Sequence, residues 1–80
     1  MIKADLTVRQ ERIMEFLSCG ANHTAAEVCD ALGVEIGSLY PDLLKLERYG
    51  LLENAWVDQP FQWGRIRVYF ASVYYLTRND

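Results

Sequence analysis

Arginine stands at two alternate positions near the C-terminal end of the chain, Arg65 and Arg67. In an extended strand these two side chains share one face with Tyr69, while the apolar residues between them face the other way. The guanidinium group donates paired hydrogen bonds to phosphate oxygens and also suits a narrow DNA minor groove. The segment from Gln59 to Asn79 carries basic residues and no acidic one. The pattern indicates a local anion-binding surface, with ordinary surface arginines as the alternative.

A second basic pair, Lys45 and Arg48, is spaced about one helical turn apart. These cations could contact a phosphate backbone. The alternative is a solvated helix face on which they pair with Asp42 and Glu47. Both interpretations stay open at the level of the sequence.

Residues that could form a catalytic or metal centre are scarce. Cys19, Cys29 and His23 have no paired spacing, whereas a zinc site needs about four ligands. There is no adjacent nucleophile–base pair and no glycine-rich loop that could cradle a phosphate. We therefore expect no enzymatic activity, no metal and no cofactor. The cysteines are interpreted as small apolar residues, one at a helix end and one on a helix face.

Aromatic residues are concentrated between Trp56 and Tyr75. Phe61 and Trp63 fall in an expected turn, where large apolar side chains are unfavourable to expose and usually mark an interface. They could fold back on a sheet, contact a nucleic acid or meet another subunit. We favour a protein interface formed by four aromatic residues, Phe61, Trp63, Tyr69 and Tyr74, and expect this end of the chain to support self-association.

The elements that would position these residues begin with two capping boxes. Thr7 is followed three residues later by Gln10, and Thr24 by Glu27, and apolar residues at helical spacing follow each pair. The pattern predicts helices over about 7–18 and 24–32, the second ended by Gly33.

A third helix is expected over about 36–49, and it contains Pro41, which is tolerated only in a first turn or at a kink. Either this helix begins near Gly37, with Ser38 as a possible N-cap, or a tight turn from Glu35 precedes a bend.

The remaining residues, about 51–77, have the β-branched and aromatic composition of a hairpin with a turn near 58–64. The order is helix, helix, helix, hairpin. A turn of about four residues joins the second and third helices, as in a helix-turn-helix unit. The expected fold class is therefore α+β, mainly α: a single winged helix-turn-helix domain over 1–80, with three helices followed by a β-hairpin wing.

Composition narrows the class of protein further. The chain has 80 residues, 51% of them hydrophobic, and a net charge of −3, which excludes a disordered chain. It has no uncharged apolar run long enough to span a membrane and no export signal, so we expect a cytoplasmic protein. The negative charge lies in residues 1–50, and the expected wing is locally basic.

One long segment carries a family resemblance: Gly37-Ser38-Leu39-Tyr40-Pro41, Leu43, Lys45-Leu46-Glu47 and Gly50-Leu51-Leu52-Glu53. It resembles the signature of the PadR-like winged helix-turn-helix regulators. Residues 64–70 are similar to the start of the family's third strand, and residues 75–77 to the close of its wing.

The resemblance implies a transcriptional regulator, expected to be a repressor, that binds double-stranded operator DNA as a homodimer. By position it puts four residues at the DNA-facing start of the recognition helix: Gly37, Ser38, Tyr40 and Pro41. It puts Lys45 at the phosphate backbone and Arg65 and Arg67 on the wing. These regulators usually dimerise through a helix after the wing, whereas this sequence ends at Asp80. We therefore expect a minimal member in which the aromatic hairpin supports the dimer.

The alternative function is a protein-interaction module on the same frame, which binds another protein through the aromatic wing rather than DNA. The acidic total charge and the presence of Glu35 and Asp42 in or beside the third helix favour that alternative. Salt-dependent binding of one duplex distinguishes the two functions.

Overall fold

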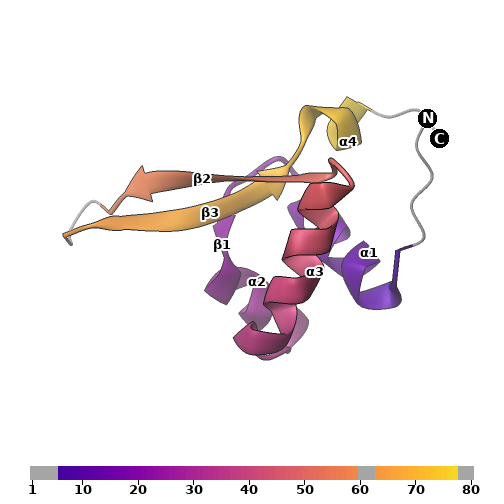
Figure 1. The fold of residues 1–80 in the computed structure, drawn as a ribbon, viewed down its shortest axis with the longest axis horizontal. Helices are drawn as coiled ribbons and strands as arrows, with labels where there is room; N and C mark the ends of the chain where they lie inside the picture. The colour runs from indigo at the N-terminus through magenta and orange to yellow at the C-terminus, as the bar shows by residue number, and fades with distance from the viewer. Residues whose placement is uncertain (1–5, 60–62, 78–80) are drawn as a thin grey trace.

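The computed structural model describes residues 6–59 and 63–77, and these form four helices and a three-stranded antiparallel sheet (Figure 1). The helices are α1 (Val8–Leu17), α2 (Ala25–Leu32), α3 (Ile36–Arg48) and α4 (Val73–Thr77). The strands are β1 (His23–Thr24), β2 (Leu52–Asp58) and β3 (Arg65–Ala71), in the sheet order β1-β3-β2. The α+β class is confirmed, and the bounds of the first three helices lie within one residue of those predicted.

Local hydrogen bonds explain where the first two helices begin and where α2 ends. Both capping boxes are present: Thr7 and Gln10 exchange backbone-to-side-chain bonds of 3.1 Å, and Thr24 and Glu27 exchange bonds of 2.8 and 3.2 Å. At the end of α2, Gly33 has a φ of +70°, a left-handed conformation that is strained for residues with a Cβ atom. The chain therefore reverses sharply between α2 and α3.

Two parts of the described fold differ from the prediction. The two-residue strand β1 was not expected; it pairs His23 with Tyr69 and Thr24 with Val68. The predicted hairpin also extended too far, because residues 73–77 form α4 rather than strand. Ser72 is the reason: its Oγ accepts from the backbone N–H of Tyr75 at 3.1 Å and donates to the Gly50 carbonyl at 2.6 Å.

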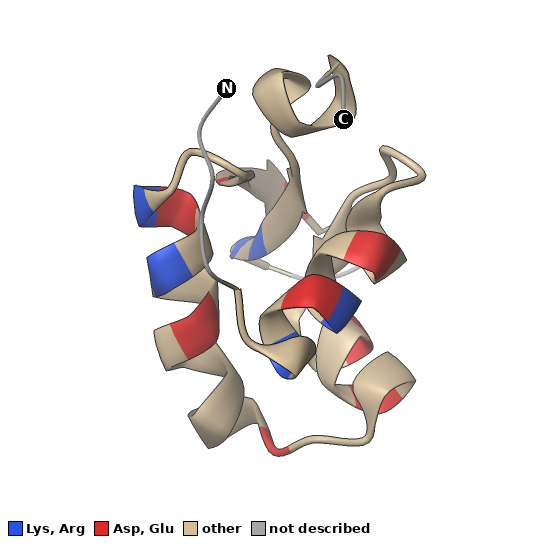
Figure 2. Cartoon of the chain, turned by 90° about the vertical axis from the view of Figure 1, so that its right-hand side faces the viewer, with Lys and Arg blue, Asp and Glu red and all other residues tan. Residues whose placement is uncertain are grey.

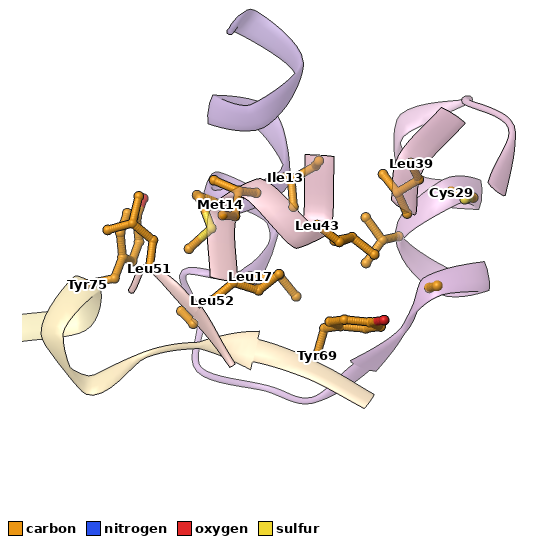
Figure 3. Packing of buried hydrophobic residues seen from close by; sticks show 14 residues of the cluster. Ile13, Met14, Leu17, Cys29, Leu39, Leu43, Leu51, Leu52, Tyr69 and Tyr75 are labelled. Carbon is orange, nitrogen blue, oxygen red and sulfur yellow. The ribbon is translucent and has the colours of Figure 1, made fainter. Parts of the chain in front are cut away.

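The hydrophobic core lies where α1, α2 and α3 meet the helix-proximal end of the sheet (Figure 3). Leu39, Leu43 and Leu46 of α3 are fully buried there, as their spacing predicts. Tyr69 is only 2% exposed and packs in the same cluster, so its assignment to a protein interface was wrong. The sheet therefore positions Tyr69 against the helices. No helix in the described ranges is long and apolar enough to cross a membrane.

The hairpin of β2 and β3 projects away from the helices beyond this core (Figure 1). Its two strands pair in register from Leu52 with Ala71 to Asp58 with Arg65. The half of the hairpin near the helices is buried, whereas Trp56 to Asp58 and Arg65 to Arg67 are exposed. The fold therefore holds two arginines on a projecting arm beside α2 and α3.

Candidate nucleic-acid interface

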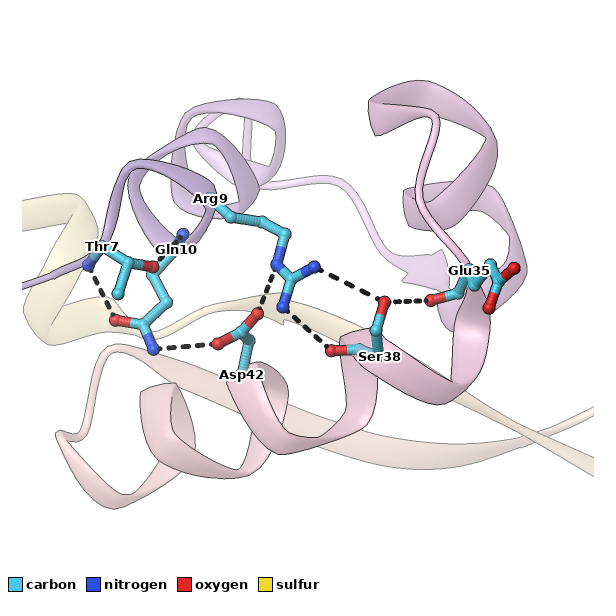
Figure 4. Close-up of polar contacts among 6 residues, drawn as sticks. All are labelled: Thr7, Arg9, Gln10, Glu35, Ser38 and Asp42. Carbon is cyan, nitrogen blue, oxygen red and sulfur yellow. Dashed lines mark hydrogen bonds and ion pairs between the residues drawn. The ribbon is translucent and has the colours of Figure 1, made fainter.

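A hydrogen-bonded clamp joins the start of α1 to the middle of α3 (Figure 4). The Nε of Arg9 donates to one carboxylate oxygen of Asp42 at 2.6 Å, and the side-chain amide of Gln10 donates to the other at 3.0 Å. The Asp42 side chain is only 13% exposed. The carboxylate that seemed unfavourable for DNA binding therefore points toward α1 and away from solvent.

Ser38 belongs to the same clamp and is not the N-cap of α3. The N-cap is Glu35, and it forms no side-chain capping bond. The Ser38 hydroxyl donates to the Glu35 carbonyl at 3.0 Å, and the guanidinium of Arg9 lies 3.2 Å from the Ser38 carbonyl oxygen and 3.5 Å from its hydroxyl. Ser38 is exposed, but its hydroxyl and carbonyl are engaged by Glu35 and Arg9, which distinguishes it from the other residues predicted for the recognition helix.

The second carboxylate of α3 is also engaged by a neighbouring element. Glu47 accepts a 2.7 Å hydrogen bond from the side-chain amide of Asn54 on β2. Both acidic residues within the bounds of α3 thus bond to adjacent parts of the fold. By contrast, Lys45 and Arg48 are exposed and form no ion pair within the described part of the chain.

The side of α3 opposite its buried leucines is a continuous exposed surface, which we call the outer face. At 3.6 residues per turn, six exposed residues lie on or beside this side of the helix. They are Gly37, Tyr40, Pro41, Leu44, Lys45 and Arg48. Its N-terminal part is mostly apolar and its C-terminal part is basic.

A concave groove of about 470 Å³ lies between α3 and the hairpin, and we call it the hairpin groove. Its lining comes from Thr24–Ala26 at the start of α2, from Ile36 and Tyr40 on α3, and from Trp56, Arg65–Arg67 and Tyr69 on the hairpin. No aspartate or glutamate is among these lining residues. The groove therefore combines aromatic surface with two cations and no opposing carboxylate in its lining.

The two arginines of the hairpin have different surroundings. The guanidinium carbon of Arg67 lies 4.6 Å from the centroid of the Trp56 ring, its partner across the strands, and this cation–π contact orients it. Arg65 lies 3.6 Å from the carboxylate of Asp58, but both side chains are largely exposed. An exposed pair of this kind contributes little to stability, so Arg65 can exchange this partner for a phosphate.

The structure brings together most, but not all, of the site residues predicted from the sequence. Gly37, Tyr40, Pro41 and Lys45 lie on the outer face, and Arg65 and Arg67 lie beside the hairpin groove that Tyr40 also lines. Two residues of this surface were missed, Leu44 and Trp56, whereas Arg48 was considered together with Lys45 as a possible phosphate contact. The spacing of Leu44 after Gly37 and Pro41 was the signal for the first. Nothing in the sequence pointed to the cross-strand pairing of Trp56 with Arg67.

The aromatic residues predicted for a protein interface are dispersed. Trp63 is fully exposed at the far end of the described hairpin, and Tyr74 is partly exposed on α4. Tyr69 belongs to the core, and Phe61 lies outside the described residues. The three described positions do not form one aromatic surface.

The acidic and basic residues of the helices are interspersed rather than separated into two patches, as seen from the side away from the hairpin end (Figure 2). The negative net charge of the chain is therefore distributed over the helical body, while the arginines Arg65 and Arg67 lie on the projecting arm.

Comparison with known proteins identifies no relative of this chain: no protein-family model, no curated protein and no solved structure matches it.

Proposed function

We propose that the protein is a winged-helix DNA-binding regulator. In this assignment α2, the turn at Gly33 and α3 form the helix-turn-helix unit, and the β2–β3 hairpin is the wing. An α-helix such as α3 is about 10–12 Å across with its side chains, which fits a B-DNA major groove about 12 Å wide. The resemblance of residues 37–53 to the PadR-like regulators supports the same assignment.

The observation that carries the proposal is the direction of the two carboxylates on α3. Because Asp42 bonds to α1 and Glu47 bonds to β2, the charges on the outer face are those of Lys45 and Arg48. A chain with a net charge of −3 thus presents a cationic helix surface to a ligand. Phosphate contacts from lysine and arginine supply most of the sequence-independent affinity for DNA.

The hairpin supplies the second contact. With α3 in the major groove, Arg65 and Arg67 lie on the arm beside it and reach the neighbouring backbone or minor groove. The lining of the hairpin groove lacks acidic residues, and the carboxylate beside it, that of Asp58, forms an exposed ion pair with Arg65 that a phosphate can replace. We extend the proposal to a repressor that occupies a two-fold symmetric operator as a homodimer, because such symmetry is typical of helix-turn-helix proteins.

Selection of duplexes from a random-sequence pool tests the proposal, followed by titration of the best duplex at several salt concentrations. We expect saturable binding whose affinity falls with salt by about 0.9 logarithmic units per phosphate contact. Lys45→Ala should flatten that slope by about one unit for each phosphate that Lys45 neutralises, whereas Arg12→Ala on α1, outside the outer face, should leave it unchanged. Binding that is equally strong at all salt concentrations, or no binding to any duplex or to DNA flanking its own gene, would contradict the proposal.

A protein-interaction module is the second candidate, and the complete exposure of Trp63 favours it. An isolated indole at the end of a projecting hairpin is unfavourable in water and gains free energy when a partner covers it. In this case the purified protein forms no saturable complex with any selected duplex. Binding of the partner protein is then abolished by Trp63→Ser and not by Lys45→Ala.

A further inference from the structure

The N-terminal half of the outer face has few groups that can hydrogen-bond to a base. Gly37, Pro41 and Leu44 have no side-chain donor or acceptor. Leu44 is 52% exposed and Tyr40 is 49% exposed, so both side chains can contact a ligand. Ser38, which could otherwise contact a base, has its hydroxyl bonded to the Glu35 carbonyl. The surface is therefore suited to apolar contact.

The major groove of B-DNA offers one apolar group on its base edges, the 5-methyl group of thymine. The other groups on the base edges are hydrogen-bond donors and acceptors. When an apolar side chain covers them, they lose hydrogen bonds to water that the side chain does not replace, and this costs binding free energy. An apolar helix surface therefore discriminates in favour of thymine and against bases whose polar edges it would cover.

Basic residues place this apolar surface at the DNA. Lys45 and Arg48 follow it on the same helix, and Arg65 and Arg67 lie across the hairpin groove from Tyr40. Because cations surround the apolar surface, charge complementarity favours a polyanionic ligand for it. A protein partner would require a complementary apolar surface flanked by carboxylates.

We propose that α3 selects its operator by contact of Leu44, Pro41 and the ring of Tyr40 with thymine methyl groups in the major groove. This inference rests on the proposed DNA-binding function. It makes thymine-rich half-sites the ligand of the outer face and gives Leu44 a direct part in specificity.

Uracil substitution tests the inference because uracil differs from thymine only by the methyl group and keeps its hydrogen-bonding edge. In the best selected duplex, each thymine is replaced singly by uracil and the dissociation constant is measured. We expect two or more positions at which affinity falls by about threefold to fourfold, the effect of one buried methyl group. Replacement at the other positions should have no effect.

Leu44→Ala assigns one of these methyl contacts. Because Leu44 is exposed and alanine is a strong helix former, we expect the variant to fold, and circular dichroism checks this. At one position the variant should bind thymine and uracil duplexes equally well, and Leu44→Gln should give the same result. The matched control is Val73→Ala on α4, another exposed apolar residue, which should retain the full difference.

The outcomes separate the two proposals. If no duplex binds, both the function and this inference are overturned. If a duplex binds with salt-dependent affinity but no uracil substitution changes that affinity, the function stands and thymine recognition is overturned. If Leu44→Ala retains every thymine preference of the unaltered protein, the assignment of a contact to Leu44 is wrong.

Discussion

At the scale of single residues, Asp42 carries a negative charge that, in the sequence, counts against the proposed DNA binding. The fold removes this conflict by directing the carboxylate toward α1. Its carboxylate is held by Arg9 and Gln10, which makes it part of the attachment of α3 to α1. The charge is therefore removed from the outer face, and the orientation of α3 depends on it.

We expect Asp42→Ala to lower the free energy of unfolding by about 1–2 kcal/mol in urea denaturation. The effect is limited because the Arg9 side chain is 39% exposed and its charge can be hydrated when the partner is removed. A double-mutant cycle with Arg9→Ala measures the coupling directly. Additive effects of the two substitutions would show that the ion pair contributes nothing.

Cys29 is expected to contribute less to stability at alkaline pH than at neutral pH. Burial in the core, reinforced by the negative charge of Asp30, raises the pKa of the Cys29 thiol above its ordinary value of 9.0. The unfolded thiol therefore ionises at a lower pH than the folded one, and the stability that Cys29 contributes falls as the pH rises above about 9.

The measurement for this prediction is the free energy of unfolding of the unaltered protein minus that of Cys29→Ala, taken from neutral to alkaline pH. The difference should shrink as the pH rises. Val28→Ala is the control, since it removes a buried apolar side chain that does not ionise, and the corresponding difference should stay constant. A constant difference for Cys29 as well would refute the linkage.

At the scale of elements, α3 contains two residues that a helix does not favour, Gly37 and Pro41, both exposed. Neither has a packing reason to be there: a Cβ atom on Gly37 would meet nothing within 4 Å, and Pro41 is outside the core. Residues that break a local rule without a structural gain are expected at functional surfaces. Both lie on the outer face.

We therefore expect Pro41→Ala to increase the free energy of unfolding by about 1–3 kcal/mol, because alanine restores a helical N–H donor and relieves a clash. Gly37→Ala should increase it by about 0.5–1 kcal/mol. Under the proposed function, Pro41→Ala should also weaken binding to the selected duplex. Increased stability with undiminished DNA affinity would show that Pro41 has no part in the contact.

Elements with strong local signals were predictable, whereas those that depend on distant partners were not. Thr7, Thr24 and Gly33 fix helix ends through bonds to residues a few positions away, so spacing alone locates them. Strand β1 has two residues and exists only because β3, more than forty residues later, pairs with it. Helix α4 follows a β-rich run, and its start depends on Ser72 reaching Gly50.

The candidate site divides in the same way. The apolar spacing of α3 predicts which side of the helix is buried, and hence that Lys45 and Pro41 are exposed. The inward direction of Asp42 and Glu47 depends on partners in α1 and β2, which spacing within α3 does not reveal. Likewise, the alternation in β3 puts Tyr69 on the face of Arg65 and Arg67. Tyr69 is nevertheless buried because it lies on the part of β3 next to the helices, whereas both arginines lie on the part that projects beyond the core.

At the scale of the whole molecule, an acidic helical body carries a projecting arm with two arginines, and under the proposed function this layout bears on how DNA affinity responds to salt. If Lys45, Arg65 and Arg67 each contact one phosphate in both subunits of a dimer, log K against log salt should have a slope of about −5. A monomer with the same contacts should have about half that slope. The salt dependence therefore reports how many subunits engage the duplex.

Self-association through the hairpin end can be tested by sedimentation and then by the salt dependence of DNA binding. Trp63 is the fully exposed aromatic residue of the described hairpin, so its burial is a large apolar gain for a second copy. Sedimentation equilibrium at concentrations in the micromolar range should show a dimer, and burial of the two indoles should contribute about 3–6 kcal/mol of the roughly 8 kcal/mol that such a dimer needs. Trp63→Ser should shift the protein to a monomer.

The salt slope then distinguishes a dimer held by the hairpin from one formed only on DNA. If Trp63 holds the subunits together, Trp63→Ser should reduce the slope to about −2.7, because one subunit binds at a time. Tyr74→Ser is the matched substitution. It replaces a partly exposed aromatic residue on α4, outside the hairpin, and should leave the dimer intact. A variant that sediments as a monomer yet retains the full slope would show that the DNA itself assembles the two subunits. A dimer that persists in Trp63→Ser would exclude the hairpin end as its interface.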